Sequence, residues 1–399
     1  AQDSKSVMEK FINKFSKYYT PVVLVFALVT YLFTQDIRLA ITILVLGCPG
    51  ALVIGVPVSN VTGIGNGAKH GVLIKGGEVM DRMNQVDTMV FDKTGTLTQG
   101  TTAVTTFISL EEEEEKSLAY LMAIEKESDH PLAKAIVAYL GEKNIRNPYP
   151  VQSTTVLEGR GNQAIVQEEE VLIGNERLLK EQALTSKPKT QKEIQAIKEQ
   201  GNSIVLVTVS GELRFVIGVS DVIRTKKKKA LMKLRKMGIK RFVMLTGDNQ
   251  ITAQAVATQL GIDEVKAELL PADKVKEVQK LKDTGHIVAF VGDGINDSPS
   301  IALADIGIAM GSGTDVAVET SDIVLMRSSF DELVHAFGLT RATIFNMRQN
   351  IGISLATVGL LFVGLFAGFI YMASGMFVHE ASILFVILNG LRLMKFRVK

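Results

Sequence analysis

Four long apolar segments, two near each end of the chain, constrain the fold more than any other feature. A membrane-spanning helix needs about 20 predominantly apolar residues to cross the hydrocarbon core of a bilayer. The four segments reach or approach that length, and 47% of the 399 residues are hydrophobic. We therefore predict two membrane hairpins that flank a soluble region. The expected spans are residues 18–34, 37–59, 350–372 and 376–395.

The positions of lysine and arginine orient these spans. Basic residues precede the first and third spans and follow the second and fourth, whereas the two short connectors together carry a single arginine. Because basic residues favour the cytoplasmic side of short loops, the soluble region and both termini are expected in the cytoplasm. The sequence thus predicts a multi-pass protein of the cell membrane, with the lipid bilayer as a partner.

Overall composition excludes several classes of protein. A net charge of +2 provides no basic surface for nucleic acid, so we expect no nucleic-acid partner. Cys48 is the only cysteine, which rules out an internal disulfide framework and favours a reducing compartment for the soluble region. The chain begins at Ala1 rather than at a methionine, and we interpret it as a fragment or a processed product.

Three short apolar runs in the soluble region each end at an aspartate. They are TMVFD (88–92), RFVMLTGD (241–248) and HIVAFVGD (286–293), and helical patterns alternate with them. Such alternation predicts a doubly wound, parallel α/β sheet, in which ligands bind at the carboxyl ends of the strands. The three aspartates are therefore expected at one crevice.

A second domain is expected inside this sheet domain, because residues 101–212 carry helical and strand-like patterns of their own. The predicted order begins with a lead-in and first hairpin at 1–62, then a stalk and the start of the sheet domain at 63–100. The inserted α+β domain follows at 101–212. The rest of the sheet domain is expected at 213–335, and the second hairpin at 336–399.

The segment DKTGTLT (92–98) carries the sharpest chemical signal. Asp92 leaves a buried strand, and its carboxylate is a candidate nucleophile that can form an acyl phosphate. The hydroxyl of Thr94 and the backbone N–H groups of the turn are suited to phosphoryl oxygens. Taken alone, Asp92 would be explained more simply as an aspartate that caps a turn. TGD (246–248), PADK (271–274) and GDGIND (292–297) add a hydroxyl, an ammonium group and carboxylates suited to Mg²⁺.

Together these motifs resemble the phosphorylation domain of P-type ATPases, within the haloacid dehalogenase-like superfamily. The resemblance runs over essentially the whole chain. It implies a haloacid dehalogenase-like α/β phosphorylation domain with an inserted α+β nucleotide-binding domain and four transmembrane helices. It also implies that Asp92 becomes an aspartyl-phosphate and that Thr246 and Lys274 contact the phosphoryl group. The implied Mg²⁺ ligands are Asp92, Asp293 and the Thr94 carbonyl, supported by Asn296 and Asp297.

Two segments of the inserted domain resemble nucleotide-binding elements of the heavy-metal, CPx-type subgroup. By that resemblance, Glu125 and His130 of EKESDHPLAKAI approach the adenine of ATP. The glycines of GRG, Gly159 and Gly161, let ATP lie close to the backbone, and Asp248 is grouped with these nucleotide contacts. On its own, a histidine before a proline is more often a helix-start residue. The lysine run 226–229 is interpreted as a solvated helix face rather than as a lipid contact.

The single cysteine precedes a proline inside the second span. Pro49 removes a backbone donor, so the helix must unwind locally, which membranes tolerate only where the backbone lines an enclosed cavity. We therefore interpret Cys48 as a ligand for a transported transition-metal cation rather than as a small buried apolar residue. His379 and Glu380 in the last span are candidate partners. If that span begins at 376, both lie shallower than Cys48, and a joint site requires a deeper start.

The choice of metal rests on the available ligands. Many copper(I) and zinc pumps of the resembled family carry a second cysteine where this chain has Gly50, and HEAS (379–382) is similar to an HEG element of the cobalt- or iron-type subgroup. Mixed sulfur, nitrogen and oxygen ligands suit borderline divalent ions. We expect export of a divalent ion such as Zn²⁺, Cd²⁺, Co²⁺ or Fe²⁺, with a copper(I) pump as the alternative.

The resemblance also implies parts that this chain does not contain. Members of the family have further amino-terminal helices and an actuator domain whose Thr-Gly-Glu loop directs water onto the aspartyl-phosphate. We therefore expect this chain alone to accept phosphate but to turn over poorly, with an amino-terminal part of the same pump as a possible partner. A membrane-anchored phosphatase and an inactive remnant or metal sensor remain alternatives. Such phosphatases usually place a second acid two residues after the nucleophile, where this chain has Thr94.

Overall fold

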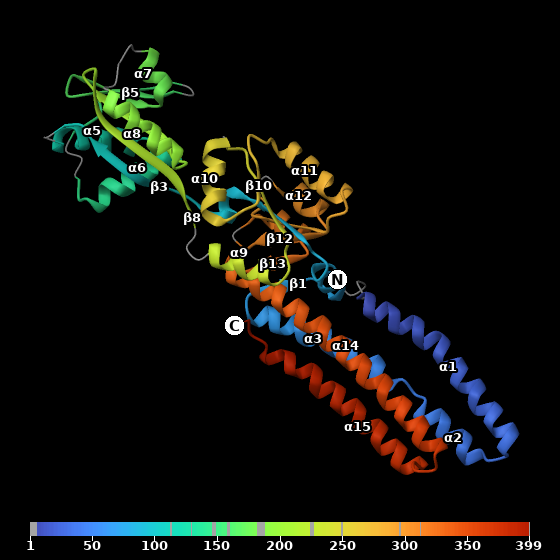
Figure 1. The fold of residues 1–399 in the computed structure, drawn as a ribbon. Coiled ribbons are helices and arrows are strands. Elements are labelled where there is room, and N and C mark those ends of the chain that lie inside the picture. Colours follow the sequence, from blue (N-terminus) through green and yellow to red (C-terminus); the bar gives the residue numbers. More distant parts are fainter. Residues whose placement is uncertain are drawn as a thin grey trace. The chain divides into compact units, whose positions relative to one another are not determined.

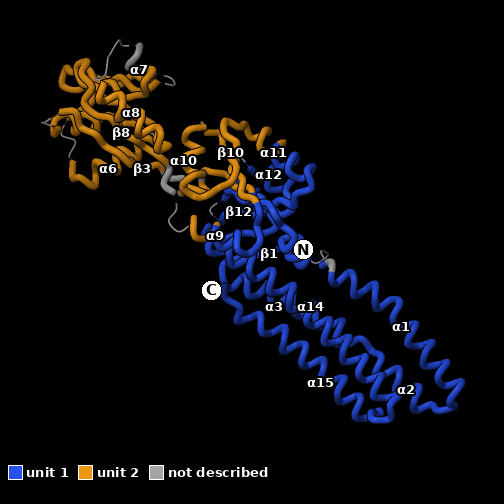
Figure 2. The backbone as a smooth tube through the Cα atoms, viewed as in Figure 1, with its two compact units in different colours: residues 1–89, 232–240, 277–399 blue, residues 90–231, 241–276 orange. Residues whose placement is uncertain are grey.

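The computed structural model forms two compact units (Figure 2). Unit 1 comprises residues 1–89, 232–240 and 277–399, and unit 2 comprises residues 90–231 and 241–276. The structure describes residues 6–111, 114–128, 130–145, 149–157, 160–181, 188–223, 227–248, 250–294, 297–311 and 313–398.

Unit 1 contains the helices that are long and apolar enough to cross a membrane. The described residues hold four such spans, Met8–Thr34, Ile37–Lys69, Phe330–Phe366 and Met372–Lys395. Many large apolar side chains on them are exposed, as expected for surfaces that face lipid; Phe33, for example, is 87% exposed. The spans are built from α1 (Val7–Thr34), α2 (Ile37–Leu46), α3 (Gly50–Lys69), α14 (Phe330–Phe366) and α15 (Met372–Leu391), the last followed by a 3₁₀ turn, Arg392–Lys395.

Helices α3, α14 and α15 run side by side (Figure 1). Small residues allow this close approach, because a Cβ built on Gly55 would lie 2.6 Å from Val386 Cγ1. Buried amides join the same helices: Asn350 Nδ2 donates to Ser59 Oγ (3.1 Å), and Asn389 Nδ2 donates to Asn350 Oδ1 (2.8 Å). The three helices therefore form one packed bundle.

The soluble part of unit 1 is an α/β layer. Strands β11, β12 and β13 pair in parallel, and β1 pairs with β13 in the antiparallel sense at the edge. The full hydrogen-bonding order of this seven-stranded sheet is β1-β13-β12-β11-β2-β9-β10. The elements wholly in unit 1 are β1 (Val72–Ile74), α4 (Gly77–Met83), β11 (Val288–Gly292), α12 (Ser298–Leu303), β12 (Ile306–Met310), α13 (Asp315–Thr320) and β13 (Ile323–Leu325), and β2 (Thr88–Asp92) begins in unit 1 and ends in unit 2.

Unit 2 contains a six-stranded antiparallel sheet in the order β3-β8-β7-β6-β5-β4. Strands β3 and β8 pair from Thr98↔Ile223 to Ser109↔Phe215, so they extend beyond the boundaries 101 and 212 expected for the inserted domain. The sheet is built from β3 (Thr98–Ser109), β4 (Ser153–Leu157), β5 (Gly161–Val166), β6 (Glu169–Gly174), β7 (Ser203–Val209) and β8 (Glu212–Ile223).

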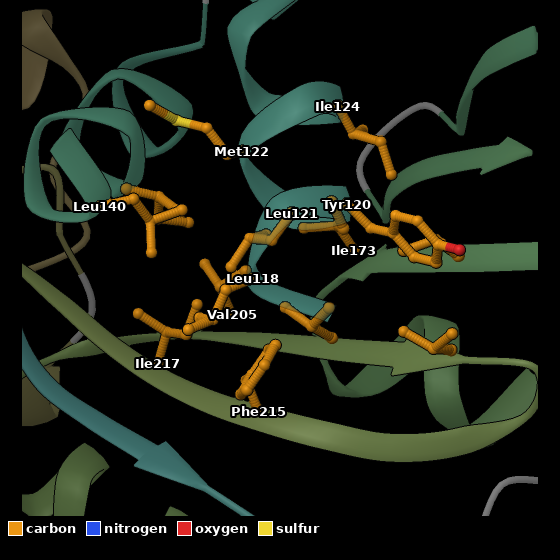
Figure 3. Close-up of a cluster of buried hydrophobic side chains, with 14 of the residues drawn as sticks. Leu118, Tyr120, Leu121, Met122, Ile124, Leu140, Ile173, Val205, Phe215 and Ile217 are labelled. Atoms are coloured by element: carbon orange, nitrogen blue, oxygen red, sulfur yellow. The ribbon is translucent and has the colours of Figure 1, made fainter. Parts of the chain in front are cut away.

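Helices α5 and α6 form a buried core with this sheet, and α8 forms a second buried cluster with β7 and β8. Figure 3 shows Leu118 and Leu121 of α5 close to Phe215 and Ile217 of β8, and all four side chains are at least 95% buried. The helices of this part are α5 (Glu115–Lys126), α6 (Pro131–Glu142), α7 (Glu176–Glu181) and α8 (Pro188–Glu199).

The remaining elements of unit 2 belong to the other sheet, where β9 and β10 pair in parallel. They are β9 (Arg241–Leu245), α10 (Gln250–Leu260) and β10 (Glu264–Lys266). Helices α9 (Lys227–Lys236) and α11 (Pro271–Asp283) each begin in unit 2 and end in unit 1.

Candidate active site and intramembrane cavity

Asp92 is the last residue of β2, a strand whose five residues are all buried. Directly after it the chain enters a tight π-type turn, Lys93–Leu97, in which Gly95 has a φ of 69°. Glycine adopts this left-handed conformation at little cost, which explains its place in the turn. The Asp92 side chain therefore lies where a rigid apolar strand meets a sharply bent loop.

Lys274 pairs with Asp92. Its Nζ donates a 2.5 Å hydrogen bond to Asp92 Oδ1, and the two side chains are only 9% and 8% exposed. Helix α11 presents Lys274 in its first turn, which begins at Pro271. An ammonium group in a poorly hydrated site can stabilise negative charge that develops during phosphoryl transfer. The sequence-predicted nucleophile and its predicted cationic partner are thus in direct contact.

A second ion pair lies beside the same turn and joins Lys93 to Asp248. The Asp248 N–H donates to Thr246 Oγ1 (3.1 Å), and Thr246 is 2% exposed just after β9 ends. Lys93 was not among the predicted site residues. The sequence did contain a signal for Lys93, because it stands between the two predicted residues Asp92 and Thr94 in DKTG.

Lys227 corrects the interpretation of the lysine run as a solvated helix face. Its side chain is 2% exposed and its ammonium donates to the carbonyl of Thr96, in the turn that follows Asp92. Lys228 and Lys229 are exposed, as expected. Lys227 therefore holds the candidate active-site loop. Charge patterning alone does not distinguish Lys227 from the neighbouring lysines.

The predicted carboxylates of GDGIND belong to unit 1. Asp293 follows the end of β11, and its carbonyl accepts from the Thr314 N–H (3.2 Å). Asp297 is 1% exposed, and its Oδ2 would lie 3.4 Å from a Cβ built on Gly292, so a glycine is favoured there. Asn296 lies outside the described residues, and Thr94 is described only in its backbone.

The predicted nucleotide contacts come from three elements around the six-stranded sheet. Glu125 in α5 is 5% exposed, and burial raises the pKa of its carboxyl to about 7. His130 caps α6, where its Nδ1 accepts from the Leu132 N–H (3.2 Å). Gly161 has a φ of 147°, and a Cβ there would overlap the Ile173 carbonyl. Gly159 lies outside the described residues.

Unit 2 also contains a cleft of about 1380 Å³, larger than the roughly 300–1,000 Å³ of typical ligand pockets. Lys93 and Asp248 lie on its walls together with Thr102, Pro131 and Asn202. The cleft thus connects the second ion pair with the first turn of α6, next to His130. Its walls combine charged and amide groups with a larger apolar surface.

In the membrane region the helix is interrupted at Cys48, as Pro49 predicts. Helix α2 ends at Leu46 and α3 begins at Gly50, so Cys48 lies in a short non-helical link. His379 Nε2 lies 2.9 Å from the Cys48 carbonyl oxygen. The break thus frees the Cys48 carbonyl, and the imidazole of His379 in α15 lies within hydrogen-bonding distance of it.

Helix α15 explains why His379 reaches this depth. It begins at Met372 rather than at 376, because Tyr371 and Ser374 cap it: the Tyr371 N–H donates to Ser374 Oγ (3.0 Å). The Glu380 side chain is 69% exposed and lies 3.6 Å from His379 Nδ1. Among the described residues, no group of three His, Cys, Asp or Glu side chains is close enough to hold a metal ion.

A cavity of about 50 Å³ adjoins the interruption. The residues on its walls include Tyr19, Cys48, Ser354, His379 and Ser382, and most of the wall surface is apolar. Glu380 is absent from this lining. The structure therefore brings together two of the three predicted cation ligands, Cys48 and His379.

Comparisons with known proteins agree with this organisation. Residues 86–305 match the family of haloacid dehalogenase-like hydrolases. The chain is 38% identical over 412 residues to a copper-exporting P-type ATPase of Staphylococcus haemolyticus and 38% identical over 404 residues to a zinc-exporting P-type ATPase of Mycobacterium marinum. All of this chain is aligned in both cases, with 50% and 55% of the two relatives. The chain thus spans about half the length of these curated relatives.

Solved structures give the same result. A zinc-transporting PIB-type ATPase in its E2.Pi state matches with a TM-score of 0.85 and 37% identity, over 96% of this chain and 64% of that one. The catalytic domain of a CPx-ATPase matches with a TM-score of 0.54 and 31% identity, over 69% of this chain and 97% of that one. The chain belongs to the haloacid dehalogenase-like superfamily and, within it, to the heavy-metal P-type ATPases.

Proposed function

We propose that this chain is the catalytic part and a portion of the membrane part of an ATP-driven exporter of a divalent transition-metal cation. The observation that carries the proposal is the buried contact between Asp92 and Lys274 at the end of β2. A carboxylate that is held by an ammonium group at the end of a rigid strand is suited to accept a phosphoryl group and release it later. The exporting activities named for the relatives support the same assignment.

In the proposed reaction an Asp92 carboxylate oxygen attacks the γ-phosphorus of ATP, the bond to the bridging oxygen breaks, and ADP leaves. Lys274 and Thr246 hold the phosphoryl oxygens. Asp92, Asp293 and the Thr94 carbonyl, supported by Asn296 and Asp297, would hold Mg²⁺, which would supply positive charge against the phosphate oxygens. The buried Asp297 and the strand-end Asp293 offer the hard oxygen ligands that this ion prefers.

The nucleotide is proposed to bind with its adenine near Glu125 and His130. Gly159 and Gly161 would admit the ring to the backbone. Asp248 would lie towards the phosphates, because it pairs with Lys93 on the wall of the large cleft. Phosphates in that cleft would then be close to the turn that follows Asp92.

Cys48 and His379 are proposed to bind the transported cation, with Glu380 near the exit. Gly50 supports a mixed ligand set, because a Cβ there would lie 3.1 Å from Ile383 Cδ1 and 3.6 Å from His379 Cε1. A side chain at position 50 would thus press on Ile383 and lie in ordinary contact with the imidazole. One thiolate with one imidazole favours a borderline divalent ion over copper(I). We infer a cytoplasmic location for both termini and both soluble domains.

Phosphorylation by labelled ATP tests the proposal. The full-length protein with Mg²⁺ should form an acid-stable, hydroxylamine-sensitive phosphoprotein, and Asp92→Asn should abolish the label. Asp283→Asn, in an exposed part of α11, is the matched control and should retain it. Label that survives Asp92→Asn contradicts the assignment. Rapid metal-independent hydrolysis of small phosphoesters would instead favour a phosphatase.

A further inference from the structure

The cavity beside Cys48 is small. Its volume is about 50 Å³, and a cavity needs about 10–15 Å³ to hold one water molecule. It therefore has room for an ion together with a few water molecules. Polar groups on its walls would then decide which ions it accepts.

Two of the three hydroxyl groups on these walls already donate to backbone. Ser354 Oγ donates to the Asn350 carbonyl (2.7 Å), and Ser382 Oγ donates to the His379 carbonyl (2.6 Å). The Tyr19 hydroxyl is different, because it is buried and makes no hydrogen bond within the described part of the chain. A buried polar group without a partner is destabilising unless a ligand or water satisfies it.

The position of the Tyr19 ring is fixed by its neighbours. It stacks on Phe15 at a centroid distance of 4.9 Å and an interplanar angle of 19°. It also packs against the buried cluster of Val23, Ala27 and Ile43, which joins α1 to α2. Helix α1 therefore holds the unpaired hydroxyl at the cavity instead of letting it turn away to another partner.

Glu380 does not supply the missing oxygen in this arrangement. Its side chain is 69% exposed and is not part of the cavity lining. Ser354 Oγ and Ser382 Oγ keep their lone pairs, but Tyr19 supplies the wall hydroxyl that has no hydrogen-bond partner among the described residues. Together with the thiol and the imidazole on the same walls, this hydroxyl makes a sulfur, nitrogen and oxygen set, which matches borderline divalent ions better than soft monovalent ones.

We propose that the hydroxyl oxygen of Tyr19 is a ligand of the transported divalent cation, together with Cys48 and His379. This inference rests on the proposed function, because it assumes that the cavity is the transport site. It assigns to α1 a part in metal selection that the sequence did not indicate. A hard oxygen donor contributes to binding of Co²⁺ or Zn²⁺ and contributes little to binding of Ag⁺, for which the thiolate dominates.

Metal titration of the full-length protein in detergent tests the proposal, with Co²⁺ absorption as the readout of the ligand set. Tyr19→Phe removes only the hydroxyl and should weaken Co²⁺ binding by about tenfold, as loss of a group around a metal typically does, and alter the Co²⁺ spectrum. Ag⁺ affinity should stay unchanged. Tyr18→Phe is the matched control, because Tyr18 is the neighbouring tyrosine and is 63% exposed. Thermal unfolding of each variant verifies that it is folded.

The possible results separate this inference from the proposed function. If Cys48→Ser abolishes the Co²⁺ spectrum while Tyr19→Phe leaves it unchanged, the role of Tyr19 is wrong and the transport site stands. If Tyr19→Phe weakens Ag⁺ and Co²⁺ equally, or destabilises the fold, its role is structural and the inference is overturned. If Cys48→Ser leaves Co²⁺ binding intact, the cavity is not the site and both proposals fail.

Discussion

The catalytic region and the intramembrane cavity place their polar groups by opposite means. Around Asp92, ion pairs determine the arrangement: Lys274 holds the carboxylate, and Lys93 holds Asp248. Beside Cys48 a break in a helix frees a carbonyl, and an imidazole and an unpaired phenol face a small space. The first site should therefore respond most to loss of charge, and the second to changes of shape and ligand type.

Removal of the charge on Lys274 should have the largest effect. Lys274→Met leaves developing phosphoryl charge without its ammonium partner, so we expect phosphorylation by ATP to slow by about 10²–10³-fold. Rapid-mixing measurements of phosphoenzyme formation check this. Lys276→Met lies on the same helix, with a side chain that is 70% exposed, and should change the rate little. Equal effects of the two variants would show that the buried pair has no special role.

Glu125 tests whether the catalytic region also contains a buried carboxyl group whose negative charge no neighbouring cation stabilises. Burial raises the pKa of its carboxyl to about 7 from 4.5, so between these pH values the folded state keeps a proton that the unfolded state loses. Stability of the inserted domain should therefore fall as pH rises through this window and level off above about pH 7. Glu125→Gln removes this loss, and should be more stable than wild type by about 3 kcal/mol at pH 8.

Hydrogen exchange of α5 amides at pH 5 and pH 8 measures that difference. Glu142→Gln, on the exposed side of α6, serves as the control and should show no such change with pH. A constant difference between Glu125→Gln and wild type across the pH range would mean that Glu125 does not titrate in this window.

A change of shape at Gly50 should affect the membrane site and leave the catalytic site intact. Gly50→Cys adds a thiol and pushes against Ile383, whose Cδ1 lies 3.1 Å from the new Cβ, while His379 Cε1 lies in ordinary contact at 3.6 Å. We expect the preference to shift from Co²⁺ towards Ag⁺ by about tenfold, because a second soft ligand joins the Cys48 thiolate. Competition binding measures the shift. An unchanged preference would break the proposed link between ligand type and metal choice.

The smallest effect is expected where a membrane hydrogen bond only connects helices. Asn389→Leu removes its 2.8 Å bond to Asn350, which should cost about 0.6 kcal/mol. A double-mutant cycle with Asn350→Leu, measured by unfolding in detergent, isolates this term. A coupling free energy as large as the free energy that corresponds to the rate loss in Lys274→Met would show that the two regions do not differ as described.

Local patterns predicted the parts of the structure that depend on nearby residues. The buried strand that ends at Asp92 and the helix break at Pro49 both follow from short segments, because apolar runs and a missing backbone donor act locally. Membership of the heavy-metal P-type ATPases, suggested by the motifs, is confirmed by the comparisons. The roles of the site residues remain proposals.

Contacts between residues that are distant in the sequence could not be predicted from local patterns. The burial of Lys227 depends on where α9 meets the turn at Thr96, 131 positions away in sequence, and a lysine run gives no sign of it. The depth of His379 depends on where α15 begins. The cap at Tyr371 starts this helix at Met372, whereas residue counting placed the start at 376. Tyr19 gave no sign of a ligand role, because the adjacent Tyr18 and Tyr19 at the start of an apolar span resemble ordinary interfacial anchors.

The central claim is that a cation at Cys48 governs phosphorylation at Asp92. The most direct measurement is the level of phosphoenzyme formed from labelled ATP by the full-length protein, with and without Zn²⁺ or Co²⁺. We predict that either ion raises the level in wild type, that Cys48→Ala removes the response to the ion, and that Asp92→Asn removes the label itself. Phosphoenzyme whose level is the same with and without ions, in wild type and in Cys48→Ala alike, would contradict the claim.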